Sequence, residues 1–184
     1  MALTSALPTL FLDRDGVINA RTPGDYVRAP DAFEPVEHLG EAMRLLAEHF
    51  GRIVVVTNQA GIGKGLMSEQ DLLAVHQKMF GLVEAAGGRI DRAYYCPHTK
   101  DAGCRCRKPA TGMAWLALAD FPEIDFEKAW MVGDSASDIR LGEALGMRTV
   151  LIDGKFEDAA ELAAMSIDFR FPTLLHFARF IAGC

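Results

Sequence analysis

Two patterns of hydrophobic and polar positions alternate along this chain, one typical of strands and the other typical of helices. Short apolar runs, several of them rich in β-branched residues, end in a charged or polar residue, which is typical of buried strands. Five such runs are expected to be strands: TLFLD at 9–13, RIVVVTN at 52–58, AYYCP at 93–97, AWMVGD at 129–134 and RTVLID at 148–153. A brief sixth strand is expected near Ile167 to Phe171.

Between those runs, apolar residues recur every three or four positions, which is the spacing of helices that pack one face on a sheet. Helices are expected from Leu39 to Phe50, from a Ser68 cap to Gly87, from a Thr111 cap to Ala119, near Ser137 to Leu145, around Glu161 and from Thr173 onward. Asp71 stands three residues after Ser68, so this helix should begin with a capping box. Residues 16–35 are rich in Gly, Pro and Asp and are expected to form a long loop.

Alternating strands and helices predict an α/β fold, in which a Rossmann-like parallel sheet carries helices on both faces. The chain has 184 residues, a length that suits a single domain spanning 1–184. Sheets of this kind bind ligands at the carboxyl ends of their strands. The residues that directly follow each predicted strand are therefore the first candidates for function.

Composition narrows the class of protein further. Half of the residues are apolar, 24% are charged and the net charge is −6, which favours a globular protein and disfavours a nucleic-acid partner. The sequence has no apolar run of the ~18 residues that a membrane span needs, and its first residues lack the basic region of a signal peptide. We expect a cytoplasmic protein, and in that reducing compartment disulfides are disfavoured.

Acidic residues follow two of the predicted strands. Asp13 and Asp15 are two positions apart at the end of the first strand, so in an extended chain both carboxylates face one pocket. Asp134 stands at the tip of the fourth strand and Asp138 follows near the start of the next helix. The first pair could also be solvated in a turn before Gly16, and Asp138 could simply cap its helix.

The second strand runs into the segment TNQAGIGKG, residues 57–65. Thr57 offers a hydroxyl group and Asn58 an amide, and the glycines allow close approach of a ligand to the backbone. The segment is not a Walker loop, because no Ser or Thr follows the Gly-Lys pair. A flexible connector before the Ser68 cap is the alternative interpretation.

Together with the Lys108-Pro109 pair, these strand ends allow phosphoryl transfer through a carboxylate nucleophile. One aspartate would attack phosphorus, while a second would protonate the leaving alcohol and later activate water. A hard cation held by carboxylates would neutralise the phosphate, and a lysine and a hydroxyl group would steady its oxygens.

The ordered motifs DRDG, TN, KP and GDSASD span about Leu10 to Asp153, and the chain resembles the phosphatases of the haloacid dehalogenase superfamily. The resemblance implies that Asp13 is the nucleophile and Asp15 the general acid and base. It further implies roles for a larger set: Thr57 and Lys108 bind the transferring phosphate, Asp13, Asp134 and the backbone carbonyl of Asp15 hold Mg²⁺, and Asp138 orients Lys108. Since no interval between the motifs has room for a cap domain, we expect a capless fold with an open site.

The loop at 94–109 holds the pattern C-x-H-x₅-C-x-C, formed by Cys96, His98, Cys104 and Cys106. Four Cys and His ligands are what a closed, structural Zn²⁺ site requires. A redox motif is disfavoured because the loop has no C-x-x-C, and a disulfide between Cys104 and Cys106 would be strained. Unrelated buried cysteines remain the plain alternative. Cys184 is expected to take no part.

This zinc-type loop, ending in Cys-Arg-Lys-Pro, is similar to that of the D-glycero-D-manno-heptose 1,7-bisphosphate phosphatases and the related histidinol-phosphate phosphatases. The segments FLDRDGVIN, GDYV, TNQAGIGKG and YYCPH resemble the heptose group more closely, whereas the x₅ spacing is also seen in the histidinol-phosphate group. The resemblance implies Mg²⁺-dependent removal of the 7-phosphate through an aspartyl-phosphate, in lipopolysaccharide or S-layer heptose synthesis.

A bisphosphate needs a second anion site, and Arg107 is the natural candidate because a guanidinium group grips phosphate with two hydrogen bonds. Asn58 and Gln59 are further candidates for substrate binding. Three other cations lie in nearby loops, and solvated surface charge is the expectation for each: Arg21, Arg28 and Lys64.

The expected partner is a small phosphorylated sugar, bound by a monomer, with no nucleic acid and no membrane. Three alternatives stay open at this point. The first is a histidinol-phosphate phosphatase. The second is a polynucleotide 3′-phosphatase, which shares the TNQ-G-I loop but conflicts with the acidic balance. The third is a non-enzymatic zinc module that binds other proteins.

Overall fold

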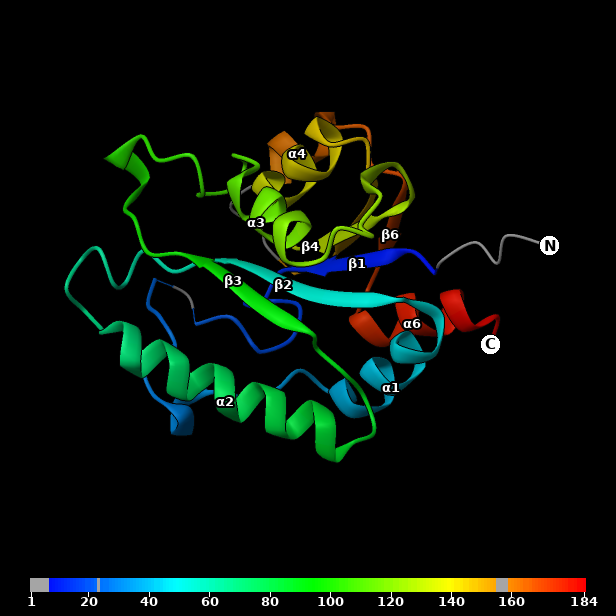
Figure 1. Ribbon diagram of the computed structural model, residues 1–184, viewed down its shortest axis with the longest axis horizontal. Coiled ribbons are helices and arrows are strands. Elements are labelled where there is room, and N and C mark those ends of the chain that lie inside the picture. Colours follow the sequence, from blue (N-terminus) through cyan, green and yellow to red (C-terminus); the bar gives the residue numbers. More distant parts are fainter. Residues whose placement is uncertain (1–6, 23, 155–158) are drawn as a thin grey trace.

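The computed structural model describes residues 7–22, 24–154 and 159–184, and its strands form one six-stranded sheet (Figure 1). The strands are β1 Thr9–Leu12, β2 Arg52–Asn58, β3 Arg92–Cys96, β4 Trp130–Gly133, β5 Arg148–Ile152 and β6 Phe169–Phe171. Their order is β3-β2-β1-β4-β5-β6, and every neighbouring pair is parallel. The predicted α/β fold with a Rossmann-like parallel sheet is confirmed.

Helices connect the strands at the predicted places. They are α1 Leu39–His49, α2 Glu69–Ala85, α3 Gly112–Asp120, α4 Ala136–Ala144, α5 Ala159–Ala164 and α6 Leu174–Ala182, with short 3₁₀ turns at Pro30–Ala32, Lys100–Ala102 and Phe126–Lys128. The capping box of Ser68 and Asp71 is present. Thr111 precedes α3, but among the described residues its side chain makes no capping hydrogen bond, because its backbone (φ −89°, ψ 0°) lacks the extended conformation of a capping residue.

The helices cover the two faces of the sheet in separate groups. Figure 1 shows α1, α2 and α6 on one side of the strands and α3 and α4 on the other. Alternate residues of β1 explain this division, since Leu10 and Leu12 belong to the core beneath the first group while Phe11 packs with the residues of α3.

The register of the central strands brings two candidate site residues to the same end of the sheet. Leu12 of β1 lies opposite Val55 of β2 on one side and Val132 of β4 on the other. β1 and β4 therefore end at nearly the same level, while β2 continues to Asn58. The strand order runs outward on one side from β1 to β3 and on the other side from β4 to β6. The boundary between β1 and β4 is therefore the switch point where such folds bind ligands. The next residues along these strands include Asp13 and Asp134.

Within the described ranges, no helix is long and apolar enough to cross a membrane. The first six residues, on which the expectation about a signal peptide partly depends, lie outside those ranges.

Candidate active site and metal-binding loop

Lys108 lies at the centre of the candidate site. Its side chain is 1% exposed, and its Nζ lies 2.7 Å from a carboxylate oxygen of Asp13 and 2.7 Å from one of Asp138. The same Nζ donates a hydrogen bond to the carbonyl of Val56 at 2.7 Å. The expected contact between Asp138 and Lys108 is therefore present, and it joins the ends of β1, β2 and α4 through one buried cation.

Asp138 also carries out the alternative role that its position predicted. Its Oδ2 accepts hydrogen bonds from the backbone N–H of Ser135 at 3.1 Å and from the Ser135 hydroxyl group at 2.6 Å, which caps α4. Gly133 leaves room for this side chain, because a Cβ at that position would lie 2.2 Å from the Asp138 Cβ. One carboxylate thus fixes both the helix and the lysine.

Asp134 is held by a residue that the sequence suggested would be solvated. The Arg21 Nε and Nη2 donate to the two oxygens of Asp134 at 3.0 and 2.7 Å. This bidentate pair corrects the expectation for Arg21, because the loop after β1 folds back over the end of β4. Gly16 has φ +91°, and a Cβ there would lie 2.0 Å from Asp134 Oδ2. The glycine of DRDG is what lets Asp134 approach.

The site carries more negative than positive charge. Four carboxylates (Asp13, Asp15, Asp134 and Asp138) face three cations (Arg14, Arg21 and Lys108), and oxygens of three of those carboxylates lie within 4.8 Å of one another. Burial raises the pKa of Asp13 to about 7, against the effect of Lys108 and with help from Asp138. Burial also raises the pKa of Asp134 to about 6, against the effect of Arg21. Crowded carboxylate oxygens with excess negative charge fit a hard cation such as Mg²⁺.

The side chain of Asp15 has its own set of hydrogen-bond donors. The Arg14 Nη2 donates to both Asp15 oxygens at 2.9 and 3.0 Å, and the amides of Asn19 and Gln59 donate to them at 3.0 and 2.8 Å. Burial disfavours ionisation of Asp15, but Arg14 and these amides outweigh it and lower its pKa. Among the described residues, the Asp15 side chain is not one of the three carboxylates whose oxygens crowd together.

Arg14 is itself fully buried and lies against the ring of His76, with Nη1 3.4 Å from Nε2. Burial and the neighbouring Arg14 charge lower the pKa of His76 to about 4. Arg14 and Asn19 lie close to Asp15 along the chain, but no spacing in the sequence indicates its contact with Gln59, 44 residues away. His76 appears there as one polar residue on the apolar face of α2.

The last two residues of β2 line the site, and the residue that follows them supports it. Thr57 and Asn58 line a cavity of about 320 Å³ together with Asp13, Asp15, Arg107 and Lys108. The Asn58 side chain also forms hydrogen bonds with both backbone groups of Lys108. Its oxygen accepts from the Lys108 N–H at 3.0 Å, and its nitrogen donates to the Lys108 carbonyl at 3.2 Å. Gln59 is fully buried and is not among the described residues that line this cavity, so it supports Asp15 and Thr57 from behind.

Three other cations of the loops have different surroundings. Lys64 lines the cavity with its ammonium group 5.4 Å from the centre of the Tyr26 ring. Arg28 is exposed and pairs with Asp25, as expected for a surface charge. Arg107 is half-buried, lines the cavity and donates to the carbonyl of His98 at 3.4 Å.

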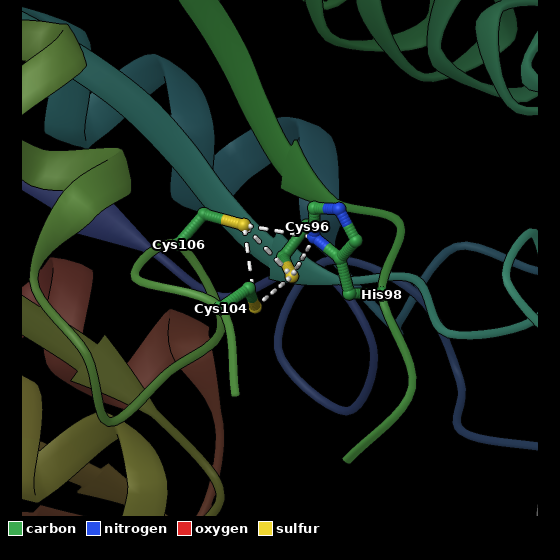
Figure 2. A group of neighbouring side chains, drawn as sticks. All are labelled: Cys96, His98, Cys104 and Cys106. Atoms are coloured by element: carbon green, nitrogen blue, oxygen red, sulfur yellow. Dashed lines mark hydrogen bonds between the residues drawn. The ribbon is translucent and has the colours of Figure 1, made fainter. Parts of the chain in front are cut away.

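The four Cys and His side chains of the 94–109 loop point toward a common centre (Figure 2). The sulfurs of Cys96, Cys104 and Cys106 lie 3.1–3.5 Å apart, and Nδ1 of His98 lies 3.2 Å from Cys106 and 3.6 Å from Cys96. Tetrahedral Zn²⁺ with bonds near 2.3 Å would set its sulfurs about 3.8 Å apart, close to these separations. The cysteines are free rather than disulfide-bonded, so the group fits zinc, while Cys184 is exposed at the chain end.

The site and fold define a haloacid dehalogenase-like hydrolase, and a family model described as HAD-hydrolase-like matches residues 105–176. Two curated relatives indicate a narrower family among these hydrolases. A D-glycero-beta-D-manno-heptose-1,7-bisphosphate 7-phosphatase of Neisseria meningitidis is 36% identical, covering 94% of this chain and 93% of its own. A D-glycero-alpha-D-manno-heptose-1,7-bisphosphate 7-phosphatase of Mycobacterium tuberculosis is 42% identical over 72% of this chain and 70% of its own.

A solved structure agrees with those relatives. The D,D-heptose 1,7-bisphosphate phosphatase of B. bronchiseptica, complexed with magnesium and phosphate, has a TM-score of 0.87 and 28% identity, covering 96% of this chain and 99% of its own. The chain therefore belongs to the D-glycero-D-manno-heptose-1,7-bisphosphate 7-phosphatase family of haloacid dehalogenase-like hydrolases.

Proposed function

We propose that this protein is a Mg²⁺-dependent phosphatase that removes the 7-phosphate of D-glycero-D-manno-heptose 1,7-bisphosphate. The observation that carries the proposal is the buried Lys108, paired with Asp13 at 2.7 Å at the end of β1. A carboxylate beside a buried cation is poised to meet an anionic phosphate, and the family membership supplies the sugar.

Asp13 acts as the nucleophile in this proposal. The Asp13 carboxylate oxygen that does not face Lys108 attacks phosphorus, and the bond from phosphorus to the sugar oxygen breaks, which leaves an aspartyl-phosphate. Lys108 and the Thr57 hydroxyl group hold the oxygens of the transferring group, and both line the same cavity as Asp13.

Asp15 gives a proton to the leaving sugar oxygen and then takes one from the water that attacks the aspartyl-phosphate. Arg14, Asn19 and Gln59 hold its carboxylate in one orientation. They also lower its pKa, so an adjacent anionic phosphate must favour the protonated form before Asp15 can act as an acid.

Asp13, Asp134 and the backbone carbonyl of Asp15 would hold Mg²⁺. When bound, the ion neutralises the phosphate and lets an anionic nucleophile approach it. The clustering of Asp13 and Asp134 supports this assignment. Burial, with a smaller contribution from the neighbouring Asp138, raises the pKa of both groups, and a bound cation would favour their charged forms.

Zn²⁺ in the 94–109 loop has a structural role in this account, since four protein ligands leave no open position. The loop leads directly into Arg107 and Lys108, so the metal would order the segment that carries both cations. Arg107 is proposed to bind the second phosphate, and its place in the cavity wall supports that role.

We further propose that residues 1–184 act as a single phosphatase domain, monomeric and cytoplasmic. The one continuous sheet, in which β1 pairs with β2 and β4, supports the single domain.

The test of the function is kcat/KM measured side by side on heptose 1,7-bisphosphate and on histidinol phosphate, with Mg²⁺ present. Because relatives are named for either anomer, both anomers are assayed, and ³¹P NMR identifies the phosphate that is released. We expect clear preference for the bisphosphate and release from carbon 7. Preference for histidinol phosphate would assign the chain to the alternative enzyme, and no hydrolysis of any phosphate ester by folded protein would refute the phosphatase.

A further inference from the structure

Arg21 uses both oxygens of Asp134. Its Nε and Nη2 lie 3.0 and 2.7 Å from Asp134 Oδ2 and Oδ1, in the two-pronged geometry that a guanidinium group adopts on a carboxylate. Asp134 is 2% exposed and Arg21 is 32% exposed. The carboxylate is thus fixed in the protein, whereas the guanidinium group arrives from a loop at the surface.

The same Asp134 oxygens are the ones that a divalent cation would need. Mg²⁺ binds carboxylate oxygen at about 2.1 Å, and each of these oxygens already accepts a hydrogen bond from a guanidinium nitrogen of Arg21. A metal ion there would also face the positive charge of Arg21 at short range, which is repulsive. Arg21 and the metal therefore compete for the negative charge and the oxygens of Asp134.

A displaced Arg21 has a second partner close by. It lines the same cavity as Thr57, Arg107 and Lys108, the residues assigned to phosphate. A guanidinium group binds phosphate with the same paired hydrogen bonds that it uses on a carboxylate. Since a third of the side chain is already exposed, it can turn from Asp134 into the cavity without unpacking a core.

We propose that Arg21 couples metal binding to phosphate binding, by exchanging Asp134 for a phosphate group of the substrate when a divalent cation takes Asp134. This inference rests on the proposed function, because it assumes that Asp134 holds Mg²⁺. Without phosphate, Arg21 competes with the metal. With phosphate, the displaced cation gains a new partner, and by linkage each ligand strengthens the binding of the other.

The test is isothermal titration calorimetry of Mg²⁺ into the zinc-loaded protein, with and without saturating inorganic phosphate. Arg21→Ala removes the competitor, and Arg28→Ala is the matched control. Arg28 comes from the same loop and carries the same charge, but it pairs with the exposed Asp25. Far-UV circular dichroism checks folding, and Arg21→Gln, which keeps size without charge, replaces the alanine variant if that variant does not fold.

Without phosphate, we expect Arg21→Ala to bind Mg²⁺ on the order of tenfold more tightly than wild type. In the variant, Mg²⁺ no longer has to displace the charge-assisted hydrogen bonds between Arg21 and Asp134. Arg28→Ala should stay within about twofold, because exposed charges are screened. Phosphate should strengthen Mg²⁺ binding in wild type by a larger factor than in Arg21→Ala.

Unchanged or weaker Mg²⁺ binding by Arg21→Ala without phosphate would overturn the proposal, and so would an equal effect of phosphate in both proteins. These titrations need no turnover. A wild-type protein that shows the coupling but hydrolyses no phosphate ester would therefore refute the proposed function and leave the competition for Asp134 standing.

Discussion

Replacing Lys108 with methionine should destabilise the protein and extend the pH dependence of its stability to higher pH. The Lys108 side chain is 1% exposed and lies 2.7 Å from oxygens of both Asp13 and Asp138. Methionine fills similar volume but leaves these two buried carboxylates without their cation. Removing one partner of a buried ion pair costs about 3–5 kcal/mol, so we expect a loss of that size in the free energy of unfolding.

The direction of the pH dependence follows from Asp13. Burial raises its pKa from 3.8 to about 7 even though Lys108 lowers it. Between these two pH values, the Asp13 carboxyl group holds a proton in the folded state that it has lost in the unfolded state. Such a group makes stability fall as pH rises from the unfolded to the folded pKa. Without Lys108 the folded pKa is higher, and the fall should extend above about pH 7 in the variant.

Urea denaturation in magnesium-free buffer, without a chelator that would remove zinc, measures both effects. Lys64→Met is the matched control, because Lys64 lines the same cavity but is exposed, and it should change stability by less than about 0.5 kcal/mol. A loss below about 1 kcal/mol for Lys108→Met between about pH 6 and pH 9 would refute the buried ion-pair account.

Three further predictions concern other parts of the site. Cys104→Ser should lose most of the bound zinc, measured by plasma emission spectrometry, while Cys184→Ser keeps it; equal zinc in both variants would contradict the ligand set. Gly16→Ala should lower the free energy of unfolding by about 2 kcal/mol or more and weaken Mg²⁺ binding measured by calorimetry. The reason is that the new Cβ would lie 2.0 Å from Asp134 Oδ2, at a residue with φ +91°. Mg²⁺ binding with wild-type affinity would show that the glycine is dispensable. His76 has its pKa lowered from 6.5 to about 4 by burial, so stability should fall by up to about 3 kcal/mol as pH drops through that window, and an unchanged slope in His76→Gln would exclude this cause.

The sequence was sufficient to predict the sheet and helices because their signals are local. β2 is a run of β-branched residues, which is typical of a strand that is buried on both faces of a parallel sheet. Ser68 and Asp71 form their capping box within one turn of the chain. The contact between Lys108 and Asp138 followed from the resemblance to a family, and not from spacing along the chain.

Other features of the site depend on how distant segments meet. Arg21 pairs with Asp134, which is 113 residues away, and only the path of the loop after β1 determines that contact. Gln59 was predicted to bind substrate because it follows a strand end, yet its amide is used to hold Asp15 at 2.8 Å. A polar residue at a strand end can face the ligand or support the residues that do, and the sequence pattern is the same in both cases.

The central claim, that Asp13 becomes phosphorylated during turnover, is tested most directly by rapid acid quench with substrate carrying ³²P at carbon 7. An acyl phosphate survives acid and is released by hydroxylamine, so labelled protein can be counted. We expect transient label on wild type, longer-lived label on Asp15→Asn, whose water-activating base is lost, and none on Asp13→Asn. Label on Asp13→Asn, or turnover by wild type with no labelled protein at any time, would contradict the account.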